Sequence, residues 1–272
     1  MKKRKTKTIF FIAIAVAAAL AIGGLTVLGV YLFSPKSDPQ FVAHQGFRSK
    51  YLGNTEAAFQ AAAAESGFYG VETDIRKTKD GVFVCNHDAT AKFANGEEKE
   101  IAATDLADLI SEPLKNDKDD RTHYICTFER YLEICKSGNK VAVVELKEDF
   151  SSADLQAILA IVDAAYDRAS ISVISFYYDP LLRIREEDPS VHLQYLSEKK
   201  NDPVFERCLQ AGIPIDVKAS ILTKKLVKTF HEAGLTVNVW TINETFDLNI
   251  VRIKGVDFVT TDIFRKEEGK NK

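Results

Sequence analysis

Eight short apolar segments alternate with helical patterns along most of the chain, and this alternation limits the folds that the chain can adopt. The apolar segments have the length of strands and lie at 41–44, 70–75, 141–147, 171–176, 191–196, 213–217, 236–242 and 256–261. The helical patterns lie between them, at 55–66, 127–137, 152–167, 179–187, 203–211, 222–233 and 245–253. Strands that alternate with helices form parallel sheets, and eight such units favour an α/β fold of the closed TIM (β/α)8 barrel type.

A doubly wound open sheet is the alternative, but no glycine-rich nucleotide loop follows the first strand. One segment departs from the alternation. Asp80-Gly81 is a hairpin signal, so residues 82–85 should fold back on the second strand instead of crossing over. The polar stretch that follows is then a small insertion after strand two, at about 82–126.

The first forty residues differ from the rest. Five positive charges lie within residues 2–7, and residues 9–33 carry no charge. This run exceeds the roughly 20 residues that cross a hydrocarbon core, whereas the apolar part of a cleaved signal peptide is usually about 7–15 residues. Basic residues before a span mark the cytoplasmic side. The pattern predicts a cytoplasmic tail (1–8), a single transmembrane anchor (9–33), a linker (34–40), an extracytoplasmic barrel domain (41–264) and a charged tail (265–272).

The charge and cysteine content exclude some functions. The formal net charge is −3, although residues 2–7 are strongly basic, so the remainder of the chain is acidic. An acidic domain is a poor nucleic-acid binder, because that binding rests on neutralising phosphates. The four cysteines are scattered and form no CxxC pair, so we expect buried free thiols instead of a disulfide framework or a metal site. The sequence leaves the oligomeric state open.

Two acidic residues stand at alternate positions near the end of the second predicted strand. Glu72 and Asp74 are two apart, so they share one face of an extended segment. In a barrel this face points inward at the C-terminal mouth, where barrel enzymes hold their active sites. Adjacent carboxylates repel unless a proton or cation lies between them, and oxygen ligands favour magnesium or calcium. The alternative is a solvated edge strand with alternating acids.

Glu145 and Lys147 repeat this spacing on the strand at 141–147. An inward lysine beside a metal site would suit a bound phosphate, and a structural Glu–Lys pair is the alternative. His44 ends the first strand and His87 follows the hairpin, and histidine exchanges protons near neutral pH. Two histidines beside a metal fit acid–base cleavage of a phosphate ester, although each alone could be structural. Trp240 could belong to the core or could stack on a small substrate.

With these residues placed, residues 40–264 resemble the glycerophosphodiester phosphodiesterase family. The resemblance rests on eight motifs in the family's order: AHQG (43–46), NTEAAF (54–59), ETDIRKTKDG (72–81), NHD (86–88), VELK (144–147), ISF (174–176), VWTIN (239–243) and GVDFVTTD (255–262). Each motif alone is weak, and together they are specific.

The resemblance implies an enzyme that hydrolyses glycerophosphodiesters to glycerol 3-phosphate and an alcohol. It makes His44 and His87 the acid–base pair. It also implies that one divalent cation, Ca²⁺ or Mg²⁺, is held by Glu72, Asp74 and Glu145. Lys147 would face the phosphate, and Asn54 and Trp240 would lie near the substrate.

The chain departs from the family pattern at two positions. Gln45 replaces the arginine that follows the first histidine, and Gly53 replaces the glutamate before Asn54. An arginine there can bind phosphate through two hydrogen bonds, whereas glutamine is neutral. We therefore predict that Gln45 contacts substrate more weakly and that Arg48 could reach the phosphate instead. Two other functions stay open: a phospholipase D-like hydrolase of lipid head groups, suggested by the anchor, and a non-catalytic phosphodiester-binding module, suggested by Gln45.

Overall fold

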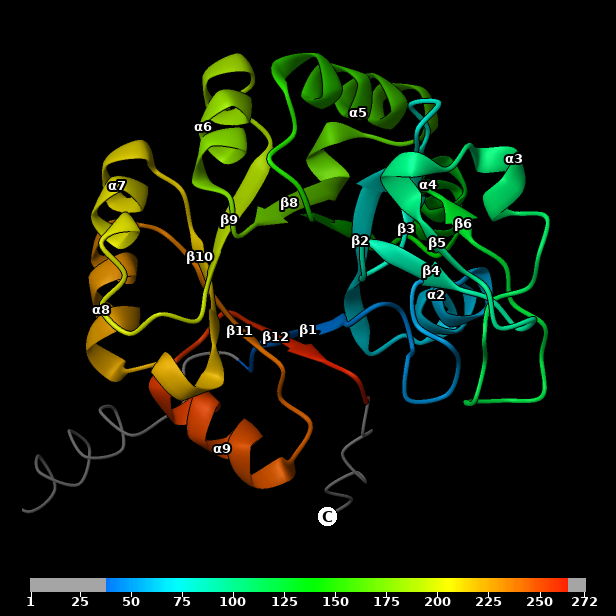
Figure 1. Cartoon of the computed structure of the whole chain (residues 1–272). Coiled ribbons are helices and arrows are strands. Elements are labelled where there is room, and N and C mark those ends of the chain that lie inside the picture. Colours follow the sequence, from blue (N-terminus) through cyan, green and yellow to red (C-terminus); the bar gives the residue numbers. More distant parts are fainter. Residues whose placement is uncertain (1–37, 264–272) are drawn as a thin grey trace, which may run out of the picture. The chain divides into compact units, whose positions relative to one another are not determined.

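A computed structural model describes residues 38–263, and in it eight parallel strands close into a barrel (Figure 1). Each strand pairs with the next, and β1 pairs with both β2 and β12 to complete the ring. The predicted (β/α)8 barrel is therefore confirmed. Its strands are β1 (Gln40–Ala43), β2 (Phe68–Lys77), β7 (Val141–Leu146), β8 (Ile171–Ser175), β9 (His192–Ser197), β10 (Ile215–Lys218), β11 (Val237–Trp240) and β12 (Phe258–Thr261).

Helices cover the outside of the barrel and connect successive strands (Figure 1). The helix α5 begins with a capping box, in which Ser151 and Asp154 satisfy each other's backbone N–H groups. The helices α7 and α9 end at Gly212 and Gly255, both in the left-handed conformation that suits glycine. The surrounding helices are α2 (Glu56–Ala64), α4 (Phe128–Ser137), α5 (Ser152–Ala165), α6 (Tyr178–Glu187), α7 (Val204–Ala211), α8 (Lys224–Glu232) and α9 (Thr245–Lys254).

The insertion after β2 begins with the hairpin that Asp80-Gly81 indicates. The strand β3 (Phe83–Cys85) runs antiparallel to β2 and also pairs with β6 (Cys126–Thr127). A two-stranded sheet of β4 (Thr90–Lys92) and β5 (Glu98–Glu100) follows, with the short helix α3 (Leu106–Leu109). The insertion has a small apolar core of its own, which includes Val84, Phe93, Ile101 and Leu109.

Alternate residues of each strand point to the helices and into the barrel. On the outer side, the hydroxyl of the fully buried Tyr131 on α4 donates to the carbonyls of Val71 at 2.6 Å and Val143 at 3.2 Å, which fixes α4 against β2 and β7. On the inner side, four buried side chains form an apolar plug beneath the mouth: Val42, Val143, Ile174 and Leu196.

The cysteines and the N-terminal segment bear on two further predictions. All four cysteines are free and buried, as predicted. Within residues 38–263 no helix has the length and apolarity to cross a membrane. The predicted anchor at 9–33 lies outside the described residues, as does the tail from 264 onward.

Candidate active site at the barrel mouth

Three carboxylates converge at the C-terminal end of β2 and β7. The two strands pair directly, with Asp74 opposite Glu145, so the inward side chains of both strands meet at one level of the barrel. Glu72, Asp74 and Glu145 are all buried, and each offers a carboxylate oxygen within 4.8 Å of the other two. The predicted metal ligands are therefore brought together.

Burial and mutual repulsion make this group costly in its charged form. Burial, followed by the charges of Asp74 and Glu145, raises the pKa of Glu72 well above its usual value. Burial, followed by Asp74, also raises the pKa of Glu145. Burial acts against ionisation of Asp74 as well, but Lys147, His87 and Asn54 outweigh it and lower that pKa. The three residues thus favour a site that contains positive charge.

The donor set fits a hard divalent cation. All three groups offer oxygen, the ligand that calcium and magnesium prefer. The Oδ1 atom of Asp74 is buried and accepts no hydrogen bond, and Lys147 Nζ lies 3.3 Å from it as an ion pair. Lys147 Nζ also lies 2.8 Å from Glu145 Oε1. The ammonium group of Lys147 thus pairs with both Asp74 and Glu145. Among the described residues, no cationic side chain is in hydrogen-bonding contact with Glu72.

Gln45 and Asn54 donate hydrogen bonds to two of the three carboxylates, those of Glu72 and Asp74. The backbone N–H of Gln45 donates to Glu72 Oε2 at 2.7 Å, and its side-chain amide donates to Asp74 Oδ2 at 2.9 Å. The amide of Asn54 donates to the same Asp74 oxygen at 2.8 Å. Contacts of this kind fix the orientation of metal ligands. Both residues were predicted to be substrate-binding; in the structure their side chains donate to Asp74, and neither is among the residues that line the mouth pocket.

His44 is oriented by an acidic residue from the far end of the chain. Its Nδ1 lies 2.7 Å from Asp262 Oδ1, and the amide of Asn243 donates to Asp262 Oδ2 at 2.7 Å. Burial opposes ionisation of Asp262, but the bond to His44 helps to lower its pKa. Arg48 lies at the same corner, with Nη1 3.5 Å from His44 Nδ1 and Nε 3.7 Å from Asp262 Oδ1.

Asp262 and Asn243 were given no role in the sequence analysis, although both lie in motifs quoted there (GVDFVTTD and VWTIN). The available signal was a polar residue just beyond each of two neighbouring strands: Asp262 directly after β12, and Asn243 three residues after β11. The sequence does not show that closure of the barrel pairs β12 with β1 and so brings Asp262 beside His44.

His87 reaches the mouth from the loop after β3. Its side chain is 56% exposed, and Nδ1 lies 2.8 Å from Asp88 Oδ1. Its carbonyl accepts from Arg76 at 2.7 and 3.1 Å, and Arg76 in turn pairs with Glu148 at 3.4 Å. The loop that carries His87 is thereby attached to the end of β2.

Both histidines line one pocket of about 230 Å³ at the mouth. Its wall combines ionisable groups with apolar and hydroxyl-bearing side chains. The ring of Phe176 meets the ring of Trp240 edge-on at 5.9 Å and forms an apolar part of this wall, as the stacking role predicted for Trp240 requires. The ionisable groups are His44, Glu72, His87, Glu145, Lys147 and Asp216, and the other lining residues are Ile174, Phe176, Leu196, Trp240, Thr241 and Thr260.

Asp216 is a further acidic residue of the pocket that the sequence analysis missed. It is 1% exposed, its Oδ2 accepts from Asn238 at 2.9 Å, and its buried Oδ1 accepts no hydrogen bond. Burial, followed by the charge of Glu145, raises its pKa well above the usual value. The signal in the sequence was an aspartate at an inward position of an otherwise apolar strand.

The fold and the mouth pocket define an enzyme of the (β/α)8 barrel class, with its ionisable groups at the C-terminal end of the strands. The model of the glycerophosphoryl diester phosphodiesterase family matches residues 44–266. The chain therefore belongs to this family and is a phosphoric diester hydrolase.

Individual relatives agree with this assignment. A glycerophosphodiester phosphodiesterase from Bacillus altitudinis is 24% identical over 237 residues, which cover 81% of this chain and 93% of the relative. A phosphodiesterase from Oleispira antarctica, solved with the product sn-glycerol 3-phosphate, superposes with a TM-score of 0.75 at 22% identity over 82% of this chain and 93% of its own. A glycerophosphodiester phosphodiesterase from Parabacteroides distasonis gives 0.70 at 25% identity over 84% and 94%.

The raised pKa of Asp216 predicts how stability changes with pH. The folded protein holds this proton to higher pH than the unfolded chain does, so Asp216 reduces stability progressively as the pH rises above about 4. Asp216→Asn removes the titration and keeps an acceptor for Asn238. We expect the stability of the variant relative to the wild type to increase steadily between pH 4 and pH 8, because only the wild type must ionise a buried carboxyl over this range. Urea unfolding without added divalent cation measures this difference.

Asp202→Asn is the matched control, because Asp202 is also buried but accepts hydrogen bonds from Tyr195, Ser197 and Val204. It should lose stability instead of gaining it at neutral pH. A constant difference between Asp216→Asn and the wild type from pH 4 to pH 8 would show that Asp216 is ionised in the folded protein.

Proposed function

We propose that this enzyme hydrolyses glycerophosphodiesters to glycerol 3-phosphate and an alcohol, with His44 and His87 as the acid–base pair and one divalent cation, Ca²⁺ or Mg²⁺, at Glu72, Asp74 and Glu145. The observation that carries the proposal is that both histidines line a single pocket together with Lys147 and two of the three carboxylates. The family membership and the glycerol 3-phosphate complex of the Oleispira antarctica relative support the substrate class.

The contacts of His44 suit a general base. An ionised carboxylate only accepts hydrogen bonds, so the Nδ1 atom of His44 carries the proton that it shares with Asp262. Its Nε2 atom is then free to take a proton from the nucleophile, which is water or a neighbouring glycerol hydroxyl. His87 lies on the loop after β3, is exposed and pairs with Asp88, and it lines the same pocket as His44. We assign it the role of the acid that protonates the leaving alkoxide.

The positive groups of the site act on the phosphate. Lys147 stays charged, because Asp74 and Glu145 outweigh the effect of its burial and raise its pKa. It stabilises charge that develops on the phosphate oxygens. Arg48, which is 37% exposed beside His44, supplies the guanidinium that the family pattern places at position 45. When bound, the cation would neutralise the carboxylates and polarise a phosphate oxygen.

We further propose that residues 9–33 anchor the enzyme in a membrane with the barrel outside the cytosol. The composition supports this, since 25 uncharged residues follow five positive charges. The chain enters the barrel through Gln40, at the N-terminal end of β1 and thus at the end opposite the mouth. A tether through the short linker would attach at that end.

The histidine roles can be tested by single substitutions. His44→Ala and His87→Ala should each lower kcat/KM for sn-glycero-3-phosphocholine by about 10²–10⁴-fold, because each removes one proton transfer. His231→Ala is the matched control, since His231 on α8 pairs with Asp257 and contacts nothing at the mouth. The assignment is wrong if either mouth variant turns over at the parent rate. No turnover by the wild type would favour a binding module instead.

Removal of the cation should abolish activity, and added Ca²⁺ or Mg²⁺ should restore it. A second readout is stability: the cation should raise the Tm of the wild type once its free concentration exceeds its Kd, and should not raise that of Glu72→Gln or Glu145→Gln. Glu148→Gln is the control, because Glu148 pairs with Arg76 outside the triad. Full activity in the presence of excess chelator would exclude the metal role.

The membrane tether predicts both location and substrate. The full chain should remain with membranes after an alkaline carbonate wash, and a chain that starts at residue 38 should be soluble. The shortened enzyme should keep kcat/KM for soluble diesters within about threefold, because the mouth lies at the other end of the barrel. Faster hydrolysis of lysophospholipids in the surrounding bilayer than of soluble diesters would instead support a lipid head-group hydrolase.

A further inference from the structure

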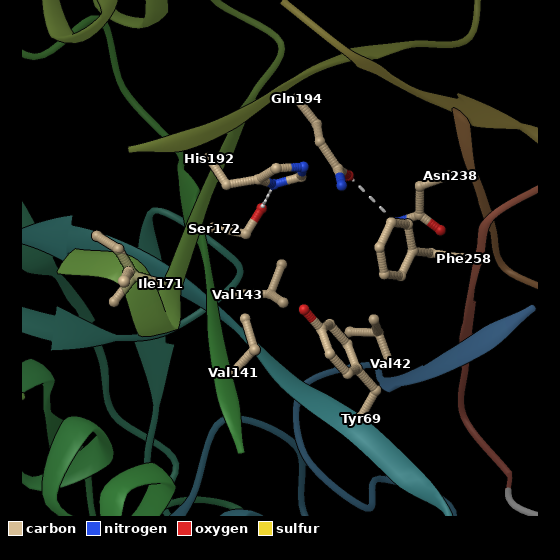
Figure 2. Close-up of a pocket in the computed structure, with 11 residues that line it drawn as sticks. Val42, Tyr69, Val141, Val143, Ile171, Ser172, His192, Gln194, Asn238 and Phe258 are labelled. Carbon is tan, nitrogen blue, oxygen red and sulfur yellow. Dashed lines mark hydrogen bonds between the residues drawn. The ribbon is translucent and has the colours of Figure 1, made fainter. Parts of the chain in front are cut away.

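A second cavity, of about 190 Å³, lies at the end of the barrel opposite the mouth (Figure 2). Its walls come from the N-terminal ends of the strands, with Tyr69 on β2, Ile171 on β8, His192 on β9 and Phe258 on β12. We propose that this cavity is a binding site for a small uncharged alcohol with an apolar body. The proposal does not depend on the reaction at the mouth.

The first support is an amide group that faces the cavity. Gln194 is 4% exposed, and its Oε1 accepts from Asn238 at 3.3 Å. Its amide nitrogen donates to no described residue, and Figure 2 shows this nitrogen turned toward the cavity. The cavity leaves this donor accessible to water or to a ligand. A ligand oxygen in the cavity would accept a hydrogen bond from it.

The second support is a histidine–serine pair beside this amide. His192 and Gln194 are two apart on β9, so both side chains lie on the inner face. Nδ1 of His192 lies 2.8 Å from Ser172 Oγ. Burial, followed by the charge of Arg185, lowers the pKa of His192, which keeps the imidazole neutral. Its Nε2 atom is then a donor or an acceptor according to the tautomer, and a hydroxyl group can pair with it in either case.

The rest of the wall sets the charge and shape of the ligand. Among residues 38–263, His192 and Tyr69 are the only ionisable groups that line the cavity, so a charged ligand would find no opposite charge there to replace its hydration. Most of the wall is apolar, with Val42, Val143 and Phe258 among the lining residues. A cavity of about 150 Å³ engineered in another protein holds benzene, so this cavity has room for roughly six to nine non-hydrogen atoms.

The cavity is separate from the proposed catalytic site. The apolar plug of Val42, Val143, Ile174 and Leu196 lies across the barrel interior, and Glu72, Glu145 and Lys147 lie above it. A ligand at the N-terminal end therefore touches none of the proposed catalytic residues. Exposed Ala169 and half-exposed Tyr69 lie at the rim and leave a route from solvent.

Benzyl alcohol and toluene form a matched pair of probes, because they differ by the hydroxyl group. Both would be titrated into the full-length protein, with binding followed by NMR of the methyl groups of Val42, Val141 and Val143. We expect benzyl alcohol to shift these signals. In Gln194→Leu the ratio of the two affinities should move about 2–12-fold in favour of toluene, as expected for the loss of one hydrogen bond. Gln210→Leu, on the exposed face of α7, should leave the ratio unchanged.

Two further variants test whether the probes bind in this cavity and through its polar groups. Val141→Phe fills the rim and should abolish the shifts from both probes. If Gln194→Leu does not fold, Ser172→Ala takes its place and should move the ratio in the same direction, because it removes the partner of His192. An absence of methyl shifts with benzyl alcohol would overturn the site. An unchanged ratio in the folded variant would overturn the assignment to an alcohol.

Discussion

The repulsion among Glu72, Asp74 and Glu145 is the interaction on which the mouth of this barrel depends. The register of β2 and β7 brings the three carboxylates within 4.8 Å, and burial removes the water that would otherwise solvate them. The described side chains offset only part of this negative charge. Lys147, Asn54 and Gln45 all contact Asp74, whose pKa is lowered, whereas Glu72 receives one backbone N–H and has a raised pKa. Glu72 and Glu145 are therefore the two carboxylates whose negative charge the protein stabilises least.

The loop after β1 explains why Gln45 faces this group. Gly46 packs so closely on α2 that a Cβ atom there would lie 2.7 Å from the carbonyl carbon of Ala58. Gln45 and Asn54 both adopt positive φ, and the N–H of Asn54 donates to the carbonyl of Gln45. This backbone turns the side chain at position 45 toward Asp74. Because this side chain is a neutral amide, it donates a hydrogen bond to Asp74 but adds no positive charge beside the carboxylates.

Much of this architecture could be predicted from the sequence, because it depends on local periodicity. The eight strands, the hairpin at Asp80-Gly81 and the inward pairs Glu72/Asp74 and Glu145/Lys147 follow from the two-residue repeat of a strand. The partner of His44 could not be predicted in this way. Asp262 is 218 positions away, and it meets His44 because β12 pairs with β1 when the barrel closes. The true contacts of Gln45 and Asn54 were also hidden, because they depend on the left-handed turn of a loop and not on a periodic pattern.

The interior of the barrel joins its two ends through one polar side chain. The amide nitrogen of Asn238 faces three acceptors, at 2.9 Å from Asp216, 3.2 Å from Thr260 and 3.3 Å from Gln194. An amide nitrogen has two protons, so the three contacts cannot all be full hydrogen bonds at once. The shortest contact goes to Asp216 in the mouth pocket and the longest to Gln194 in the cavity at the other end. Because two protons face three acceptors, full hydrogen bonds to any two of them leave the third without one. Asn238 therefore links the hydrogen bonding of Asp216 in the mouth pocket to that of Gln194 in the cavity.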